Sequence, residues 1–562
     1  MKYFKFLFTV NNKFFLLIVL FSLIISTILE YIFVTSVPYL LNIVFNDKVI
    51  LNNFFVQLGS KQDVLKYILV IILLVFLLKS IFYFFNQYLY FKYSFDVQNK
   101  LSQLLLSKYL NKNYSVFINS HSSEMLRNVK DNTELVRGLL QNCLTFISEI
   151  LVFLGLCVII VYQSTLISLI SIIFIIFFSC LYIFFSRRLS KNWSLKRQQF
   201  ESEKIQYLQE SLSGFKELKL FNKEDFFIKN YNEKNIKSNL MNFRFNLLYS
   251  FPKVYLEIIG ALGVVVLIIL NLDKGDKNSF LTAVPLLGLY FVAFVRILPS
   301  VNRILNSIET HRYGFPALQI IYNTLKKNDP INIRLSEKKI NFTKDLVFKN
   351  IDFIFPNKKI IFKNINFKIK FGDRIGIIGE SGIGKTTLVN LISGLLTPTY
   401  GLILSDNQNI NENIKSWQSN IGYIYQSTFL MNDTVENNIS FNSKKDDAHN
   451  KKIKNVIKLI NLNTFINKLP KGLETVVGDK GAKLSGGQIQ RIGIARALYF
   501  NRTILICDEI TNSLDSISEK HIINCLSNLD KTIIMISHKK SNLDFCSKIY
   551  EIKDNQLFLI KK

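Results

Sequence analysis

Cysteine and acidic residues are scarce in this chain of 562 residues, and charged residues of either sign make up only 20% of it. The six cysteines form no CxxC pair and have no metal-ligand spacing, so neither a disulfide scaffold nor a cysteine-based metal site is expected. Acids number 41 against 69 Lys and Arg, a net charge of +28. No basic stripe with interleaved aromatic residues accompanies this excess, so nucleic acid is not an expected partner.

Apolar residues, by contrast, are abundant. Hydrophobic residues make up 49% of the chain, 49 of its residues are Phe, and the mean hydropathy is +0.24. This composition is too apolar for a soluble multidomain protein and too charged for a protein lying wholly in a membrane. It predicts a membrane part joined to a globular part.

Six apolar runs are long enough to cross about 30 Å of hydrocarbon at about 1.5 Å per residue. They lie at residues 14–45, 64–91, 138–163, 165–186, 254–272 and 280–300. The links after the second and fourth runs are long and rich in Lys and Arg, which predicts cytoplasmic termini. Helical spacing in residues 196–222 predicts that the spans continue into the cytoplasm as stalks.

A polar linker around Pro330 separates these runs from strand-like segments at 346–355 and 360–369. We therefore expect a membrane domain over residues 1–325, a linker over 326–345 and a second domain over 346–562. The motif GESGIGKT at 379–386 lies between a strand-like run (374–378) and a helix-like run (387–392). This arrangement is typical of a phosphate-binding loop.

The residues of this loop suit nucleotide chemistry. Its glycines let backbone N–H groups face phosphate oxygens, Lys385 can reach the β and γ phosphates, and the Thr386 hydroxyl can ligate Mg²⁺. The residues expected to bind ATP here are Gly379, Glu380, Ser381, Gly382, Ile383, Gly384, Lys385, Thr386 and Thr387.

Two further motifs follow. The apolar strand TILICDE (503–509) ends in two carboxylates, of which Asp508 is expected to hold Mg²⁺ through water and Glu509 to act as general base. In isolation such a pair more often caps a strand, but a phosphate loop in the same domain favours the catalytic interpretation. LSGGQ (484–488) opens a helix whose N-terminus can bind an anion, and a plain helix start is the alternative.

Together GESGIGKT, LSGGQ and ILICDE resemble the ATP-binding cassette of ABC transporters. Six spans followed by one cassette resemble an ABC exporter half-transporter, so the resemblance covers essentially the whole chain. It implies an α-helical membrane domain of the type IV exporter fold and an α/β P-loop ATPase domain, with ATP and Mg²⁺ as cofactors. Because each ATP lies between the phosphate loop of one cassette and the LSGGQ of another, a homodimer is expected, with a heterodimer as the alternative.

The resemblance also implies further site residues. Gln426 would sense the γ-phosphate and Mg²⁺, His538 would contact the γ-phosphate, and Phe355 would stack on adenine where the family usually has Tyr. The signature residues of this chain, which would complete the ATP site of the partner cassette, are Ser485, Gly486, Gly487 and Gln488. Asp515 would lie at the dimer seam.

Several other segments match or depart from the family pattern. Tyr425 replaces a usual Pro and Asn512 a usual Ser. Residues 475–481 resemble the exporter-specific loop, with Asp479 where Glu is usual, and residues 114–121 and 223–228 fall at coupling-helix positions.

The cargo is less clearly indicated. Residues 49–58, 251–263 and 294–304 resemble PglK-type flippases of lipid-linked oligosaccharides. We therefore expect an ATP-driven flippase of the inner (plasma) membrane that moves such a lipid, or a similar amphiphile, outward. A multidrug, lipid A-type or peptide exporter is the runner-up, and a non-transporting membrane ATPase that acts as a regulator is the alternative from another class.

An ionisable side chain within a membrane span costs free energy, so each such residue is first treated as a candidate functional residue. Counted from the outer loops, five such residues lie roughly 21–24 Å deep and Arg303 lies deeper. The five are Glu30, Lys79, Glu149, Glu257 and Arg296. One interpretation pairs Glu30 with Lys79 and Glu257 with Arg296 as structural ion pairs. The other has Lys79, Arg296 and Arg303 line a cavity that holds an anionic head group.

Overall fold

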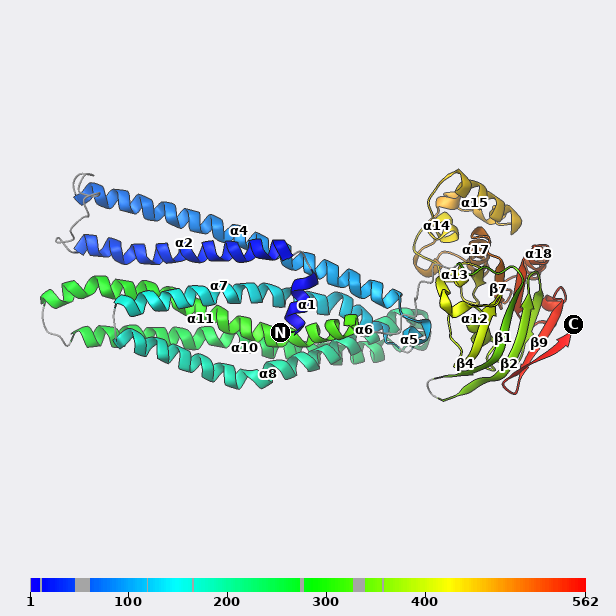
Figure 1. Cartoon of the computed structure of the whole chain (residues 1–562), viewed down its shortest axis with the longest axis horizontal. Coiled ribbons are helices and arrows are strands. Elements are labelled where there is room, and N and C mark those ends of the chain that lie inside the picture. The colour runs from blue at the N-terminus through cyan, green and yellow to red at the C-terminus, as the bar shows by residue number, and fades with distance from the viewer. Residues whose placement is uncertain are drawn as a thin grey trace. The chain divides into compact units, whose positions relative to one another are not determined.

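The computed structural model describes residues 2–10, 13–45, 61–118, 120–163, 166–272, 277–326, 339–355 and 358–561. Two compact units are present (Figure 1), one comprising Met1–Asn111 and Asn119–Asn328 and the other Lys112–Ile118 and Asp329–Lys562. We call them the helical unit and the cassette unit. The sequence segment 49–58 lies outside the described residues, as does most of the expected linker.

Long helices build the helical unit. They are α2 (Lys13–Phe45), α4 (Lys61–Leu110), α7 (Thr133–Gln163), α8 (Leu166–Ser213), α10 (Glu224–Leu272) and α11 (Lys277–Lys326). Among the residues that the structure describes, four stretches are long and apolar enough to cross a membrane, namely Phe14–Ser36, Lys66–Leu110, Ser122–Ile159 and Ile172–Ser213. Side chains of the sixth expected span lie largely outside the described residues, as do about half of those of the fifth.

The expected stalks are present. Helices α4, α8, α10 and α11 have 50, 48, 49 and 50 residues, about 72–75 Å each at 1.5 Å per residue, more than twice the hydrocarbon thickness. Shorter elements are α1 (Lys2–Val10), α6 (Ser122–Arg127), a π-helical turn (Asn128–Asn132) and α9 (Phe215–Phe221). Gly214 separates α8 from α9, and Asn222, at φ 52°, ends α9 in a left-handed conformation.

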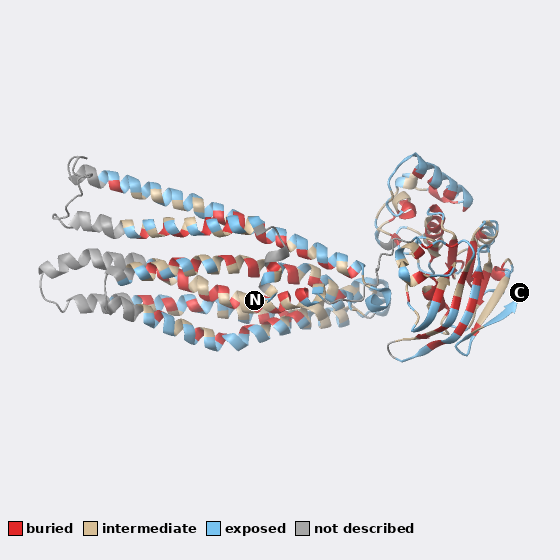
Figure 2. Cartoon of the chain, in the orientation of Figure 1, coloured by how far each residue is buried: buried red, intermediate tan, exposed pale blue. Residues whose placement is uncertain are grey.

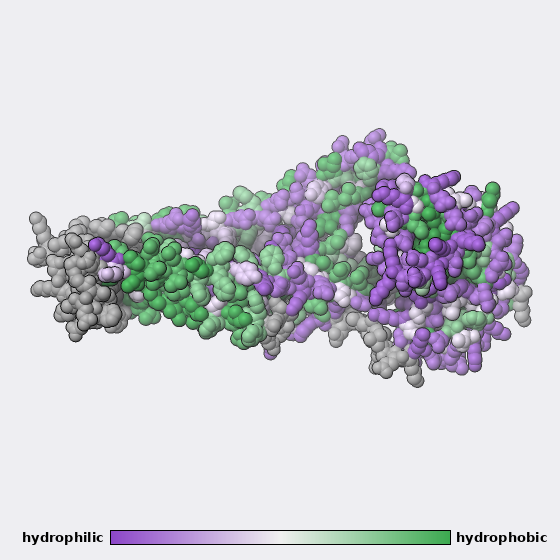
Figure 3. Space-filling view, turned by 90° about the horizontal axis from the view of Figure 1, so that it is seen from above, coloured by the Kyte–Doolittle hydropathy of each residue, from purple (hydrophilic) through white to green (hydrophobic). Residues whose placement is uncertain are grey.

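Below the expected spans the stalk helices pack through one face. Tyr93, Val97, Leu101 and Leu105 recur every four residues on α4 and are fully buried, against apolar residues of α7 and α11. In the apolar stretches, by contrast, most side chains are exposed along α4 (Figure 2). Figure 3 shows hydrophobic residues gathered over this part of the helical unit. Such an exposed apolar surface is stable only where lipid or another chain covers it.

The cassette unit contains two sheets. One is antiparallel, in the order β2-β1-β4-β5, and the other has the order β10-β9-β3-β8-β7-β6. The strands are β1 (Asp345–Ile354), β2 (Ile360–Lys370), β3 (Arg374–Ile378), β4 (Tyr400–Ser405), β5 (Gln408–Asn409), β6 (Ile421–Ile424), β7 (Ile504–Asp508), β8 (Thr532–Ile536), β9 (Lys548–Lys553) and β10 (Gln556–Lys561). All neighbours in the second sheet are parallel except β10 and β9.

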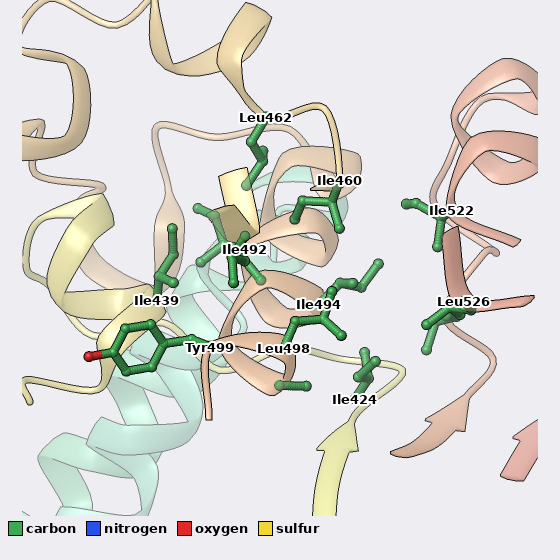
Figure 4. Close-up of a cluster of buried hydrophobic side chains, with 14 of the residues drawn as sticks. Ile424, Ile439, Ile460, Leu462, Ile492, Ile494, Leu498, Tyr499, Ile522 and Leu526 are labelled. Atoms are coloured by element: carbon green, nitrogen blue, oxygen red, sulfur yellow. The ribbon is translucent and has the colours of Figure 1, made fainter. Parts of the chain in front are cut away.

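Helices complete the cassette unit: α5 (Tyr114–Ile118), α12 (Lys385–Ile392), α13 (Ile414–Gln418), α14 (Val435–Ser440), α15 (Asp447–Leu459), α16 (Asn463–Ile466), α17 (Gly486–Tyr499) and α18 (Ser516–Ser527). Every residue of β7 and β8 is buried, as expected for parallel strands covered on both faces. Figure 4 shows one of the resulting apolar clusters, in which Ile492, Ile494 and Leu498 of α17 lie among residues of neighbouring elements.

Candidate ATP site

The expected site residues follow the carboxyl ends of four adjacent parallel strands. In the order β3-β8-β7-β6, the chain continues into the phosphate loop after Ile378, into His538 after Ile536, into Glu509 after Asp508 and into Gln426 after Ile424. Ligands of open α/β sheets bind at this edge because the loops that leave the strands converge there. The sheet order thus brings together motifs that lie more than a hundred residues apart in the sequence.

Positive backbone φ angles shape the phosphate loop. Gly384, which precedes α12, has a φ of 121°, and a Cβ there would lie 2.7 Å from Ile361 Cγ2. Only glycine fits both constraints. The Lys385 ammonium donates to the carbonyl oxygens of Gly379 at 2.7 Å and Glu380 at 3.3 Å, which holds the side chain along the loop. Burial lowers the pKa of Lys385, opposed by the nearby carboxylates of Glu509 and Asp508.

Glu509 is held by three polar side chains. Its Oε2 accepts hydrogen bonds from Gln426 at 2.8 Å and Asn512 at 2.9 Å, while Oε1 lies 2.8 Å from His538 Nε2. That same nitrogen lies 3.3 Å from Lys385 Nζ. The carboxylate therefore belongs to one polar network with two of the residues expected to contact the γ-phosphate.

The backbone of Glu509 is also unusual. Its φ is 50°, a left-handed conformation that non-glycine residues adopt rarely and that concentrates at functional sites. The amide N–H donates to the Ile536 carbonyl at 3.0 Å, which ties the residue to the end of β8. This conformation turns the chain sharply after β7.

The sequence motifs did not predict Tyr423. Its hydroxyl donates to Asp508 Oδ2 at 3.2 Å, because Tyr423 pairs with Ile506 in the parallel register of β6 and β7, two residues before Asp508 on the same face. Burial raises the pKa of Asp508, partly opposed by this hydrogen bond. Tyr425 stacks on Tyr423, with ring centroids 4.0 Å apart.

The signature residues begin α17. Ser485 and Gln488 form a capping box, in which Gln488 Oε1 accepts from the Ser485 N–H at 2.9 Å and the serine hydroxyl accepts from the Gln488 N–H at 3.4 Å. A Cβ on Gly487 would lie 3.1 Å from the Ser513 carbonyl oxygen, so glycine permits close packing there. Asp515 caps α18, accepting from the Ser518 N–H at 3.0 Å.

Phe355 lies at the end of β1, where its ring is half-buried and meets Phe353 edge-on at 5.0 Å. In residues 475–481, Val477 donates its N–H to the Asp433 carbonyl at 3.1 Å and the Thr475 carbonyl accepts from Val435 at 3.1 Å. Both segments are thus part of the folded cassette.

One of the two expected ion pairs within the spans is confirmed and the other is wrong. Glu30 of α2 lies 2.9 Å from Lys79 of α4, as expected. Its second oxygen, however, accepts a hydrogen bond from Arg296 of α11. Glu257 instead lies 4.0 Å from Lys253, one turn earlier on α10, with 67% of its side chain exposed. The expected depth of each residue in the membrane therefore predicted the first pair correctly. It failed for the second pair because the rotation of α10 about its axis points Glu257 away from Arg296.

A second buried carboxylate binds the remaining expected cation. Glu149 of α7 accepts from Arg303 at 2.6 Å and from the Ser300 hydroxyl at 2.7 Å. Arg296, Ser300 and Arg303 are spaced four and three residues apart, so they lie on one face of α11. Lys79, Arg296 and Arg303 are thus all ion-paired, and 40% of the Arg303 side chain is exposed.

These features define a multi-pass membrane protein that carries a P-loop ATPase fold. The sequence matches the family described as ABC transporter over residues 362–512 and the ABC transporter transmembrane region over residues 16–270. It is 30% identical over 463 residues to an uncharacterised ABC transporter ATP-binding protein of Sinorhizobium fredii, covering 79% of this chain and 75% of that one. The chain belongs to the ABC transporters.

Other relatives have more specific names. An ATP-dependent lipid A-core flippase of Desulfotalea psychrophila is 31% identical over 380 residues, covering 66% of this chain and 64% of the relative. A flippase of the same name from Syntrophus aciditrophicus is 32% identical over 354 residues, 61% of this chain and 57% of the relative. The matches thus span less than two thirds of these relatives. A bacterial Atm1-family ABC exporter, solved with ATP bound, has a TM-score of 0.80 at 19% identity, covering 97% of this chain and 95% of that one, which shows the type IV exporter fold.

Proposed function

We propose that this chain is one half of an ATP-driven exporter that flips an amphiphilic lipid from the inner leaflet outward. The observation that carries the proposal is the convergence of Lys385, Asp508, Glu509, Gln426 and His538 at one edge of the cassette sheet, in a chain that also has long membrane-type helices. Energy from ATP hydrolysis is what such a helical unit needs to move a polar head group across hydrocarbon.

The chain's own residues suit each part of the hydrolysis. The phosphate loop and Lys385 bind and orient the phosphates. Glu509 takes a proton from the attacking water once its carboxylate leaves the Gln426 and Asn512 amides for that water. His538, within reach of both Glu509 and Lys385, orients the carboxylate and binds the γ-phosphate.

The residues around Asp508 fit Mg²⁺. Magnesium prefers hard oxygen ligands, and carboxylate, hydroxyl and amide oxygens are available from Asp508, Thr386 and Gln426. Asp508 is buried at the end of β7, where an uncompensated carboxylate is unfavourable and a cation is stabilising. When bound, the ion neutralises charge on the phosphates.

Removal of the Tyr423 hydroxyl is expected to weaken metal binding. Tyr423→Phe leaves Asp508 without the hydrogen bond that orients it, and loss of such an outer contact lowers metal affinity about tenfold or more. The measurement is Mn²⁺ binding by electron paramagnetic resonance, with a non-hydrolysable ATP analogue present. Tyr425→Phe is the matched control, since its hydroxyl bonds nothing in the described residues. Equal Mn²⁺ affinity in both variants would contradict the role of Tyr423.

The working unit we propose is a dimer of two copies of this chain. Each chain has one phosphate loop and one LSGGQ signature, so two cassettes complete two ATP sites, with Ser485, Gly486 and Gly487 facing the partner's nucleotide and Asp515 near the seam. A heterodimer with a related chain is the alternative. Both termini would lie in the cytoplasm, with the spans in the inner (plasma) membrane.

The cargo we propose is a lipid with a phosphate-bearing head group, such as a lipid-linked oligosaccharide or a lipid of the lipid A type. Arg296 and Arg303 support this, since an arginine binds phosphate as readily as carboxylate and can exchange one for the other. Arg303→Gln should lower translocation at least tenfold while ATP hydrolysis persists, whereas Arg303→Lys keeps part of it. Unchanged translocation by Arg303→Gln would show that this arginine does not bind the cargo.

The deciding experiment uses proteoliposomes. Purified protein, ATP and a fluorescent polyprenyl diphosphate-linked sugar or labelled lipid A are combined, and accessibility of the head group to an impermeant quencher is followed. ATP-dependent loss of quenching supports the flippase. ATPase activity without movement of either lipid would favour the non-transporting regulator, and movement of apolar drugs or peptides alone would favour the other exporter classes.

A further inference from the structure

A cavity of about 1040 Å³ in the helical unit is lined by residues of α8 and α11. On α8 the lining runs from Phe184 to Leu195, and its members recur at three- and four-residue spacing, which defines one face of a helix. On α11 it comprises residues 311, 312, 315 and 316. Two helix faces thus meet around a concave surface, and its lining includes none of the ATP-site residues and none of the residues that pair with Glu30 or Glu149.

The lining of this cavity is strongly basic. It includes Arg187, Arg188, Lys191 and Arg312, and none of its described members is acidic. Arg187, Arg188 and Lys191 are exposed and form no ion pair within the described part of the chain. Arg312 differs, since it bonds Glu309 at 2.8 Å and the Ser186 hydroxyl at 3.0 Å. The cavity lining therefore has three cations without an ion-pair partner among the described residues, and a fourth, Arg312, that is held by Glu309 and Ser186.

The position of the cavity along α8 places it at the membrane surface. The apolar run that predicts the fourth span ends at residue 186, so Arg187 and Arg188 come directly after the hydrocarbon on the proposed cytoplasmic side. Phe184 and Phe185 precede them, with 78% and 65% of their surface exposed, and Phe315 contributes from α11. Apolar rings beside cations suit the boundary between acyl chains and head groups, because the rings can contact the chains while the cations reach the head groups.

We propose that this cavity binds the phosphate-bearing head group of an inner-leaflet lipid. Arginines recognise phosphate through paired donors, and basic pockets between membrane helices on the cytoplasmic side bind anionic head groups. The phenylalanines contact the glycerol or isoprenoid part above them. Cations that merely mark the cytoplasmic side need no cavity, whereas here they share a concave surface of head-group size. The bound lipid is bulk anionic phospholipid or the cargo itself, since both carry this chemistry.

Trp193 allows a direct measurement. It lies on α8 between lining residues Asn192 and Leu195, half-buried, and the chain's other tryptophan, Trp417, is fully buried in the cassette. The full-length protein is placed in phosphatidylcholine nanodiscs that contain equal fractions of brominated phosphatidylglycerol or brominated phosphatidylcholine. Quenching of Trp193 is expected to be severalfold stronger with the brominated anionic lipid.

The combined variant Arg187→Gln, Arg188→Gln and Lys191→Gln should reduce that preference to about that of neutral lipid. Its matched control removes the same charge elsewhere in the helical unit, through Lys196→Gln, Lys229→Gln and Arg244→Gln, and should keep the preference. Basal ATPase activity, unchanged in both, reports that each variant is folded. An unchanged preference in the cavity variant, or equal losses in both variants, would overturn the proposal.

Competition identifies the source of the lipid. Farnesyl diphosphate and unbrominated phosphatidylglycerol are each added as competitors. If farnesyl diphosphate relieves quenching at a far lower concentration, the bound lipid is a cargo-type diphosphate lipid. If phosphatidylglycerol does so, the bound lipid is bulk phospholipid. Failure of both to relieve quenching would count against a head-group site. This assay contains no translocation step, so it is decided independently of the proposed flippase activity.

Discussion

Glu509→Gln is expected to lower ATP turnover about 10²- to 10⁴-fold, the range that a positioned general base contributes. The amide keeps the shape of the side chain, and its oxygen can still accept from Gln426 and Asn512, so the fold and nucleotide binding persist while the basic oxygen is lost. Phosphate release by the full-length protein measures turnover, and a fluorescent ATP analogue measures binding.

A second carboxylate in the same unit provides the control. Glu551 of β9 is half-buried and forms no ion pair or side-chain hydrogen bond in the described residues, so Glu551→Gln should hydrolyse ATP at close to the unmodified rate. Turnover by Glu509→Gln within a few fold of that control would show that another group activates the water. Reduced ATP binding by Glu509→Gln would instead show that Glu509 contributes to ATP binding rather than to the hydrolysis step.

Glu30→Gln is expected to destabilise the helical unit by about 3–5 kcal/mol, as when one partner of a buried ion pair is removed. Only 7% of the Glu30 side chain is exposed, and it compensates both Lys79 and Arg296, from two other helices. A neutral amide leaves both cations, which are largely buried, without a counter-charge. Thermal unfolding in nanodiscs measures the effect as a lowered Tm.

Glu257→Gln is the matched control for this prediction. It removes the same charge at a similar expected depth, but Glu257 is largely exposed and lies 4.0 Å from Lys253 of its own helix, so it compensates no cation on another helix. The Tm should therefore change little. Adding Lys79→Met and Arg296→Met to Glu30→Gln should restore much of the lost stability, because the uncompensated charges are gone. Equal Tm values for Glu30→Gln and Glu257→Gln would contradict the three-helix ion cluster.

Local motifs predicted much of the cassette. The run 374–378 coincides with β3, and 360–369 differs from β2 by one residue. Of the two carboxylates, Asp508 ends β7 and Glu509 follows it. These segments were predictable because backbone conformation and chemistry are specified within a few neighbouring residues. Tyr423 was not, since its contact with Asp508 depends on the register of β6 against β7, and no local pattern encodes a register between strands about 80 residues apart.

The membrane helices divide in the same way. Span positions and depth of the ionisable residues came from length alone, and depth was sufficient to pair Glu30 with Lys79 across a helical hairpin. It was insufficient for Glu257 and Arg296, because a helix that is apolar all round gives no signal of its rotation. Packing decides which side faces inward, and it turned Arg296 towards Glu30 and Glu257 outward.

By itself, then, the amino-acid sequence determined that this protein has a membrane part and an ATPase part, and which residues of the second are expected to carry the chemistry. Tertiary structure alone decided that Arg296 meets Glu30 rather than Glu257, which tyrosine orients Asp508, and that Arg187, Arg188 and Lys191 share a cavity with Arg312. The reason is physical: motifs and hydropathy act over a few residues, whereas rotation, register and concavity arise only when distant segments pack together.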